Sequence, residues 1–253
     1  MNGSYVGIDL AAQPRRTGVA VLRETGEGVL LEHVGVGADD DALLDHLQGA
    51  AKIGVDVPLG WPKPFVELLT AHAAGTLSAP ASTGGDWRRG LALRATDLEV
   101  HRRTGLTPLS VATDRIAHPA PRWAGIEARL RAEGLETQRD GEGQICEVYP
   151  AAALRIWGLA HRGYKGAEKA APRAALVDAL DAQLPALDWN GHREQCAAED
   201  DALDAVLAAL IAREVDHGRA VPPPAEQRGL ARQEGWIWLP REGTFPLRTD
   251  AAG

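Results

Sequence analysis

Cysteine is scarce in this chain, which has two among its 253 residues, Cys146 and Cys196. Neither lies in a Cys-x-x-Cys pair or at zinc-ligand spacing from a histidine, which argues against a disulfide framework and a structural zinc site. Apolar runs of membrane length are also missing, and the first ten residues, MNGSYVGIDL, lack the features of a signal peptide. These absences predict a cytoplasmic protein without a membrane partner.

Excess positive charge is missing from the chain as a whole. Its formal net charge is −8, which disfavours binding of nucleic acid over the entire surface. Residues 86–131 differ, because they hold nine arginines and five acidic residues and so carry +4, against −12 for the remainder. Such a segment can hold an anionic ligand locally, or it can simply be a solvated, helix-rich surface.

The first 60 residues alternate between apolar, β-branched stretches and turns. The strands expected here are 4–11, 17–25, 29–36 and 53–58, with a helix from Asp39–Asp41 to about Ala51. Short connections make the first three strands an antiparallel meander. The fourth follows a helical crossover, so it is expected to run parallel to its partner.

The rest of the chain predicts more helix than strand. A mostly helical insertion is expected at about 60–140, with a mobile loop at 79–85. Expected helices are 63–75, 91–103, 123–133, 151–157, 167–183 and 198–213, and expected strands are 144–150 and 235–240. The predicted fold class is α/β: an RNase H-like mixed sheet, a three-stranded antiparallel meander followed by parallel strands, flanked by helices. We expect one domain over 1–253, with a C-terminal strand and tail at 235–253.

Four aspartates are candidates for a metal site. Asp9 and Asp56 each lie in a short apolar strand, where an unpaired carboxylate is costly. Asp201 and Asp204 lie three residues apart, on one side of a helix that is apolar almost all round. If the two strands are neighbours, these acids form an oxygen-only cluster that suits Mg²⁺ or Mn²⁺, with either Asp201 or Asp204 as the inner ligand. Capping or pairing with arginine is the alternative.

The segment RATDLEVHRRTG (94–105) holds further candidates. Arg94, Arg102 and Arg103 are potential phosphate ligands, and Asp97 is either another catalytic acid or the ion-pair partner of Arg94. Glu147 lies on a predicted strand and can face the carboxylates, and Lys165 is a potential phosphate ligand. The plainer alternatives are that Glu147 is an ordinary strand-face glutamate and Lys165 an ordinary surface lysine.

These stretches resemble a known family. The chain is similar to the bacterial domain family of unknown function numbered 429, which has been suggested to consist of RNase H-like nucleases. The matching stretches, in order, are GIDLA, TGVAVL, GVDVPLGWP, RATDLEVHRRTG, TPLSVATDRIAHPAPR, CEVYPAAALRIWGL with GYK, DDALDAVLAALIAR and EGWIWLP. The resemblance implies an acidic site of Asp9, Asp56, Asp97 and Asp201 or Asp204, with Arg94 and Glu147 beside it.

The leading hypothesis is therefore a Mg²⁺- or Mn²⁺-dependent phosphodiesterase, with nucleic acid or a nucleotide as its substrate. A non-catalytic module that binds nucleotide, nucleic acid or protein is the main alternative. An actin-like or sugar-kinase-type ATPase is a weaker one, because the chain has neither a duplicated half nor a GxxxxGK[ST] loop. The substrate and the oligomeric state are not determined by the sequence.

Overall fold

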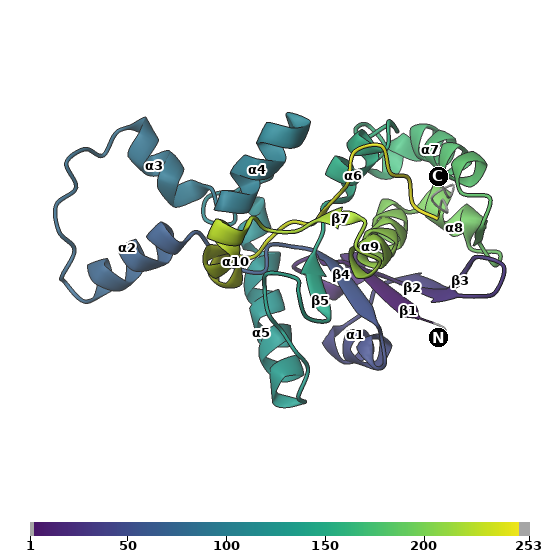
Figure 1. Ribbon diagram of the computed structural model, residues 1–253, viewed down its shortest axis with the longest axis horizontal. Helices are drawn as coiled ribbons and strands as arrows, with labels where there is room; N and C mark the ends of the chain where they lie inside the picture. Colours follow the sequence, from purple (N-terminus) through teal and green to yellow (C-terminus); the bar gives the residue numbers. More distant parts are fainter. Residues whose placement is uncertain (1–2, 248–253) are drawn as a thin grey trace.

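A six-stranded mixed sheet lies at the centre of the computed structural model, which describes residues 3–247 (Figure 1). The strand order is β5-β4-β1-β2-β3-β6. The strands are β1 (Ser4–Asp9), β2 (Gly18–Glu24), β3 (Val29–Val36), β4 (Lys52–Asp56), β5 (Ile145–Glu147) and β6 (Leu187–Asp188). β1, β2 and β3 form an antiparallel meander, and β4 and β5 extend it in parallel. The predicted RNase H-like α/β fold is confirmed.

Helices cover both faces of this sheet (Figure 1). Val6 and Ile8 of β1 pack on one face against α1 and α5, whereas Tyr5 belongs to the core on the opposite face. This division follows from the alternation of side chains along a strand. The helices are α1 (Asp40–Leu47) and α5 (Pro119–Ala132) on one side, and α6 (Pro150–Ile156), α7 (Ala170–Gln183), α8 (Arg193–Ala198) and α9 (Asp200–Asp216) on the other.

α9 lies directly on β1, β2 and β4, and every residue from Ala202 to Ala212 is buried. Burial on more than one side, predicted from its apolar sequence, is confirmed. The approach is close because glycines lie beneath the helix. A Cβ atom at Gly7 would lie 2.0 Å from the carbonyl oxygen of Ala205, and one at Gly54 would lie 2.4 Å from that of Ala208. The helix backbone therefore occupies the space that strand side chains would otherwise fill.

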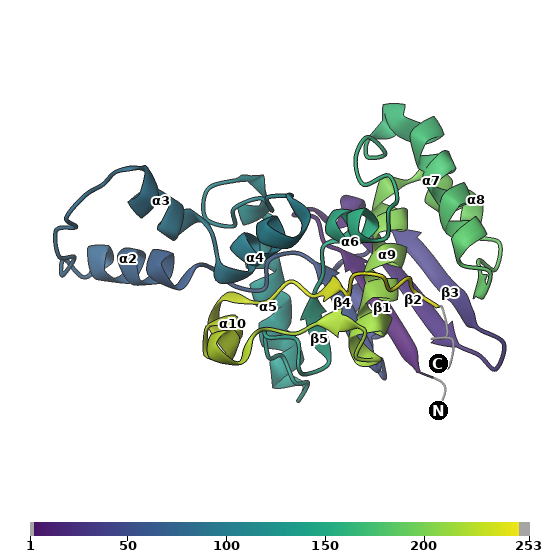
Figure 2. The same cartoon turned by 45° about the horizontal axis from the view of Figure 1, so that its top comes forward.

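Two helices form an arm that projects away from the sheet. α2 (Lys63–Ala73) and α3 (Gly85–Ala92) extend to one side of the molecule in both views (Figures 1 and 2). Neither helix contains a buried residue. Three of the five large hydrophobic side chains exposed among the described residues, Val66, Leu69 and Leu77, lie on this arm. The helices of this arm therefore contribute little to the core.

Glu234 fixes both ends of the arm. It is the last residue of α10 (Arg228–Glu234) and is buried. Its carboxylate accepts a hydrogen bond from the backbone amide of Lys63 at 2.6 Å and another from that of Ala95, the first residue of α4 (Ala95–Thr104), at 2.9 Å. One carboxylate thus accepts hydrogen bonds from amides at the starts of two helices, which have no partner within their own helix.

Several boundaries differ from those predicted. The helix expected at 91–103 is two helices, because Leu93 and Arg94 have extended backbone between α3 and α4. The helix expected at 198–213 begins at Asp200, because Glu199 is extended and separates it from α8. Both breaks occur at residues with good helix propensity, so local sequence did not reveal them.

The strands near the C-terminus are shorter than expected. The predicted strand 144–150 ends at Glu147, because Pro150 begins α6. Of 235–240, only β8 (Leu239–Pro240) is a strand, and it pairs with β7 (Ala220–Val221) in a separate two-stranded sheet. The predicted tail continues to 253, of which residues 248–253 lie outside those described. Within the described part of the chain, no helix has the length and apolarity needed to cross a bilayer.

Candidate metal centre

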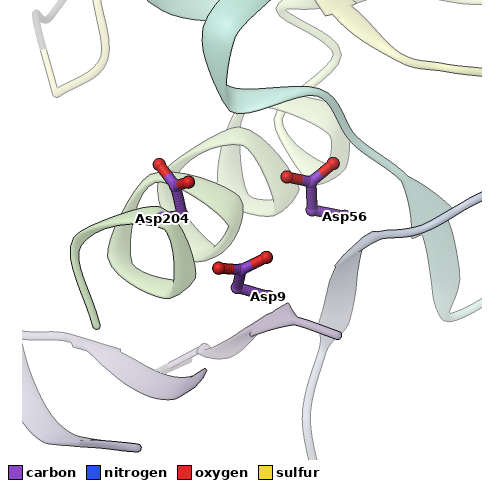
Figure 3. Close-up of side chains that lie close together, drawn as sticks. All are labelled: Asp9, Asp56 and Asp204. Atoms are coloured by element: carbon purple, nitrogen blue, oxygen red, sulfur yellow. The ribbon is translucent and has the colours of Figure 1, made fainter. Parts of the chain in front are cut away.

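Three carboxylates converge beside the N-terminal half of α9 (Figure 3). Asp9 is the last residue of β1, Asp56 is the last residue of β4, and Asp204 lies in the second turn of α9. One carboxylate oxygen from each lies within 4.8 Å of the others. Asp204 is buried, and the two strand aspartates are partly buried.

The strands bring Asp9 and Asp56 together through a repeated local pattern. Each strand carries Gly-x-Asp, as Gly7-Ile-Asp9 and Gly54-Val-Asp56, and the two patterns are aligned residue for residue in the parallel pairing. Residues two apart in a strand share a face, so each glycine and its aspartate face α9. The glycine admits the helix backbone, and the aspartate then lies beside the helix.

Asp204 has two side-chain partners, both from the segment that follows α6. The hydroxyl of buried Tyr164 donates a hydrogen bond to Asp204 Oδ1 at 2.8 Å. The ammonium group of Lys165 forms an ion pair with Oδ2 of the same carboxylate. Lys165 was predicted as a phosphate ligand, and the structure places its charged group against the acidic cluster.

Burial and repulsion between carboxylates make Asp9 and Asp56 resist ionisation. The pKa of Asp9 is raised well above its ordinary value, first by burial and then by the charge of Asp204, with Lys165 opposing. Burial also raises the pKa of Asp56 to about 7, with Lys165 opposing and the charges of Asp204 and Glu147 adding to the shift. Burial disfavours the charged form of Lys165, but neighbouring acids, led by Asp204, outweigh it and raise the pKa of this group.

This arrangement fits a divalent cation. Three carboxylates provide oxygen ligands, the donors that Mg²⁺ and Mn²⁺ prefer. One ammonium group, that of Lys165, faces three acids, so positive charge is deficient when all three are ionised. A divalent cation held by Asp9, Asp56 and Asp204 would relieve the repulsion that helps to raise the pKa values of Asp9 and Asp56.

Asp201 lies outside the cluster. Its carboxylate accepts two hydrogen bonds from the Arg16 guanidinium, at 2.6 and 3.0 Å. Asp201 lies one turn before Asp204, beside the 3₁₀ turn Pro14–Arg16 that follows β1. Between the two aspartates that the sequence left open, the structure brings Asp204 to the strand carboxylates.

Arg94, Asp97 and Glu147 form a separate buried network. Arg94 is 1% exposed, and its guanidinium donates to Asp97 Oδ1 at 2.9 Å and to both oxygens of Glu147 at 2.8 and 2.7 Å. Glu147 also accepts a hydrogen bond from the amide of Leu59 at 3.0 Å. Asp97 is therefore the ion-pair partner of Arg94, and this arginine is neutralised by two acids. The negative charge of Glu147 contributes to the raised pKa of Asp56, so the network and the candidate metal centre are coupled electrostatically.

The other predicted phosphate ligands lie on the surface of α4. Arg102 and Arg103 both form ion pairs with Glu99, at 2.7 and 2.6 Å. Neither residue lines the cleft that contains the aspartates. The structure brings together Asp9, Asp56, Asp204 and Lys165, and it leaves Arg102 and Arg103 apart from them.

A cleft of about 500 Å³ opens over Asp9 and Asp56. Sequence reasoning missed several residues that line it, among them Tyr164, Arg115 and Arg162. Arg162 and Tyr164 precede Lys165 by three residues and one residue in the sequence HRGYK, so proximity to that lysine was the available signal. Arg115 was counted only as part of the arginine-rich segment.

The family of the chain is identified by comparison. A family model described as "Protein of unknown function (DUF429)" matches residues 7–228. No curated protein and no solved structure matches the chain. The matched range includes all three clustered aspartates together with Lys165.

Proposed function

Because the chain belongs to the DUF429 family of proteins of unknown function, its activity has to be argued from its site, and we propose that it is a metal-dependent phosphodiesterase that acts on nucleic acid or nucleotides. Mg²⁺ or Mn²⁺ would be held by Asp9, Asp56 and Asp204. The observation that carries this proposal is the convergence of three carboxylates from two strand ends and one buried helix, two of which, Asp9 and Asp56, line a cleft.

A bound divalent cation would supply Lewis-acid stabilisation of charge and a nucleophilic water for phosphodiester cleavage. In that hydrolysis the water oxygen bonds to phosphorus, the bond to the leaving oxygen breaks, and the proton from water passes to that oxygen or to solvent. The role of the chain is to hold the ligands in place. Tyr164 and Lys165 fix the carboxylate of Asp204, and the α9–sheet contact fixes its distance from Asp9.

A non-catalytic binding module is the second candidate, and one contact favours it. The ammonium group of Lys165 already lies on Asp204, so part of the acidic charge is balanced without a metal. In that case the cleft would bind its ligand equally well with and without a chelator. The two functions therefore differ in their dependence on divalent cations.

The test measures Mn²⁺ binding and cleavage together. Calorimetric titration of the wild-type protein with Mn²⁺ should give saturable binding, and Asp9→Asn should abolish it while retaining the fold. Cleavage should be screened on RNA, DNA, hybrid, junction and dinucleotide substrates with Mn²⁺ and with EDTA. Asp45→Asn, an exposed aspartate of α1, serves as the matched control.

Full activity of Asp9→Asn, or activity that persists in EDTA, would contradict the proposal. Ligand binding that EDTA does not change, with no cleavage of the ligand, would instead support the binding module. A Mn²⁺ anomalous peak between Asp9, Asp56 and Asp204 in a crystal would support the metal site independently of any substrate.

A further inference from the structure

The cleft is bounded by two loops in addition to the carboxylate cluster. One loop follows α4 and contributes Thr107, Leu109 and Arg115. The other follows α6 and contributes His161 and Arg162. A volume of about 500 Å³ lies within the range of sites that enclose a small molecule. These side chains border the approach to Asp9 and Asp56.

Four cationic side chains, apart from histidine, line the cleft, and they fall into two pairs. Arg94 and Lys165 are committed to carboxylates, as described above. Arg115 and Arg162 are exposed, and within the described residues 3–247 neither forms a side-chain hydrogen bond or ion pair. They are the cations of the cleft that remain available to an anionic ligand.

An aromatic ring lines the cleft together with Arg162. Tyr149 lines the same cleft and is partly buried. Burial raises the pKa of Tyr149, and the charges of Lys165 and Arg162 oppose that rise. Within one cleft, a guanidinium can bind a phosphate and a tyrosine ring can stack against a base or sugar.

We propose that Arg115 and Arg162 bind a phosphate group of a short substrate, a dinucleotide or the end of a single strand, whose scissile phosphodiester lies at Asp9, Asp56 and Asp204. This inference rests on the proposed phosphodiesterase function and specifies its substrate class. An internal site in a duplex is disfavoured, because duplex binding relies on many dispersed cations and the chain carries a net charge of −8.

The binding experiment uses a fluorescently labelled dinucleotide with a 5′-phosphate, the same dinucleotide without that phosphate, and a duplex. The wild-type protein should bind the phosphorylated dinucleotide most tightly. Arg115→Ala and Arg162→Ala should each weaken that binding about tenfold and affect the unphosphorylated form much less. Arg89→Ala is the matched control, since Arg89 is exposed, lies on α3 and does not line the cleft.

Two sets of results separate this inference from the proposed function. Phosphate-dependent binding that needs both arginines, but without any cleavage in Mn²⁺, supports the substrate class and rejects the phosphodiesterase. Metal-dependent cleavage of internal duplex sites that both arginine variants retain rejects the substrate class and supports the phosphodiesterase. Failure of the wild-type protein to bind either dinucleotide also overturns this inference.

Discussion

Asp9 and Asp56 are direct partners in the parallel register of β1 and β4, and each is the last residue of its strand. Two carboxylates are therefore held side by side, at the C-terminal ends of two neighbouring interior strands, by backbone pairing alone. A third, Asp204, is added by the helix that crosses the same strands. The backbone thus determines the spacing of the acids before any side-chain contact is considered.

The two aspartates at the start of α9 should respond differently to the same substitution. Asp204→Asn should weaken Mn²⁺ binding by about a hundredfold, because it removes one of three clustered carboxylates. Asp201→Asn should leave Mn²⁺ affinity nearly unchanged, because its carboxylate pairs with Arg16 outside the cluster. Calorimetric titration of both variants measures the difference. Equal losses in the two variants would show that Asp201 shares the metal site.

Stability without metal should fall as pH rises. Asp56 has a pKa of about 7 in the folded protein, above the value of about 4 in an unfolded chain. Between these values the folded state holds a proton that the unfolded state has released, so the free energy of unfolding decreases as pH rises through this window. Urea unfolding in EDTA at about pH 5 and about pH 8 measures the decrease. Asp56→Asn should reduce it.

A divalent cation should oppose that pH effect, because it binds the deprotonated carboxylates. The rise in Tm caused by Mn²⁺ should therefore be larger at about pH 8 than at about pH 5. A rise of the same size in Asp9→Asn would mean that Mn²⁺ stabilises the protein elsewhere.

Gly7→Ala should destabilise the protein strongly. The new Cβ would lie 2.0 Å from the carbonyl oxygen of Ala205 and 2.2 Å from the amide nitrogen of Ala209, so α9 would have to move. We expect a loss of about 3 kcal/mol or more in the free energy of unfolding. Gly125→Ala is the control, because that exposed glycine of α5 has no atom within 4 Å of the new Cβ. Urea unfolding of both variants measures the difference. A free energy of unfolding for Gly7→Ala equal to that of the wild-type protein would contradict the close packing of α9 on β1.

Arg94→Met should destabilise the fold by about 3–5 kcal/mol, because Asp97 and Glu147 would remain buried without their cation. Adding Asp97→Asn and Glu147→Gln should recover much of the loss, since the uncompensated charges are then gone. Arg102→Met, which breaks only exposed ion pairs on α4, should change stability little. A small effect of Arg94→Met, or no recovery in the triple variant, would contradict a structural role for the network.

The N-terminal half of the sheet could be predicted from sequence because its signals are local. Alternating apolar residues and short turns define β1 to β3, and the apolar run around Asp56 defines β4. The arm could not be predicted, because amphipathic patterns give helices and do not say whether they pack on the body or project from it. At the break between α3 and α4, Arg94 is held by tertiary contacts with Glu147 and with the carbonyl of Glu234, and its amide donates a hydrogen bond to Asp97 at 2.9 Å.

Only part of the site could be predicted, because some of its residues have a local sequence signal and others are brought together by tertiary packing. Asp9 and Asp56 stand out as acids inside apolar strands, and parallel pairing then brings them together. The choice between Asp204 and Asp201 depends on how α9 is rotated over the sheet, which is a tertiary property. The ion pair of Lys165 with Asp204 joins residues 39 positions apart, so no local sequence pattern predicts it.

The attachment of the arm has a practical consequence for protein engineering. The chain leaves the body at Lys63 and re-enters at Ala95, and both amides bind the same Glu234 carboxylate. The two ends of the arm are therefore neighbours, so a short turn can bridge them without stretching the sheet. The arm accordingly marks the position where a fluorophore, an affinity tag or a whole inserted domain can be accommodated while the acidic centre keeps its geometry.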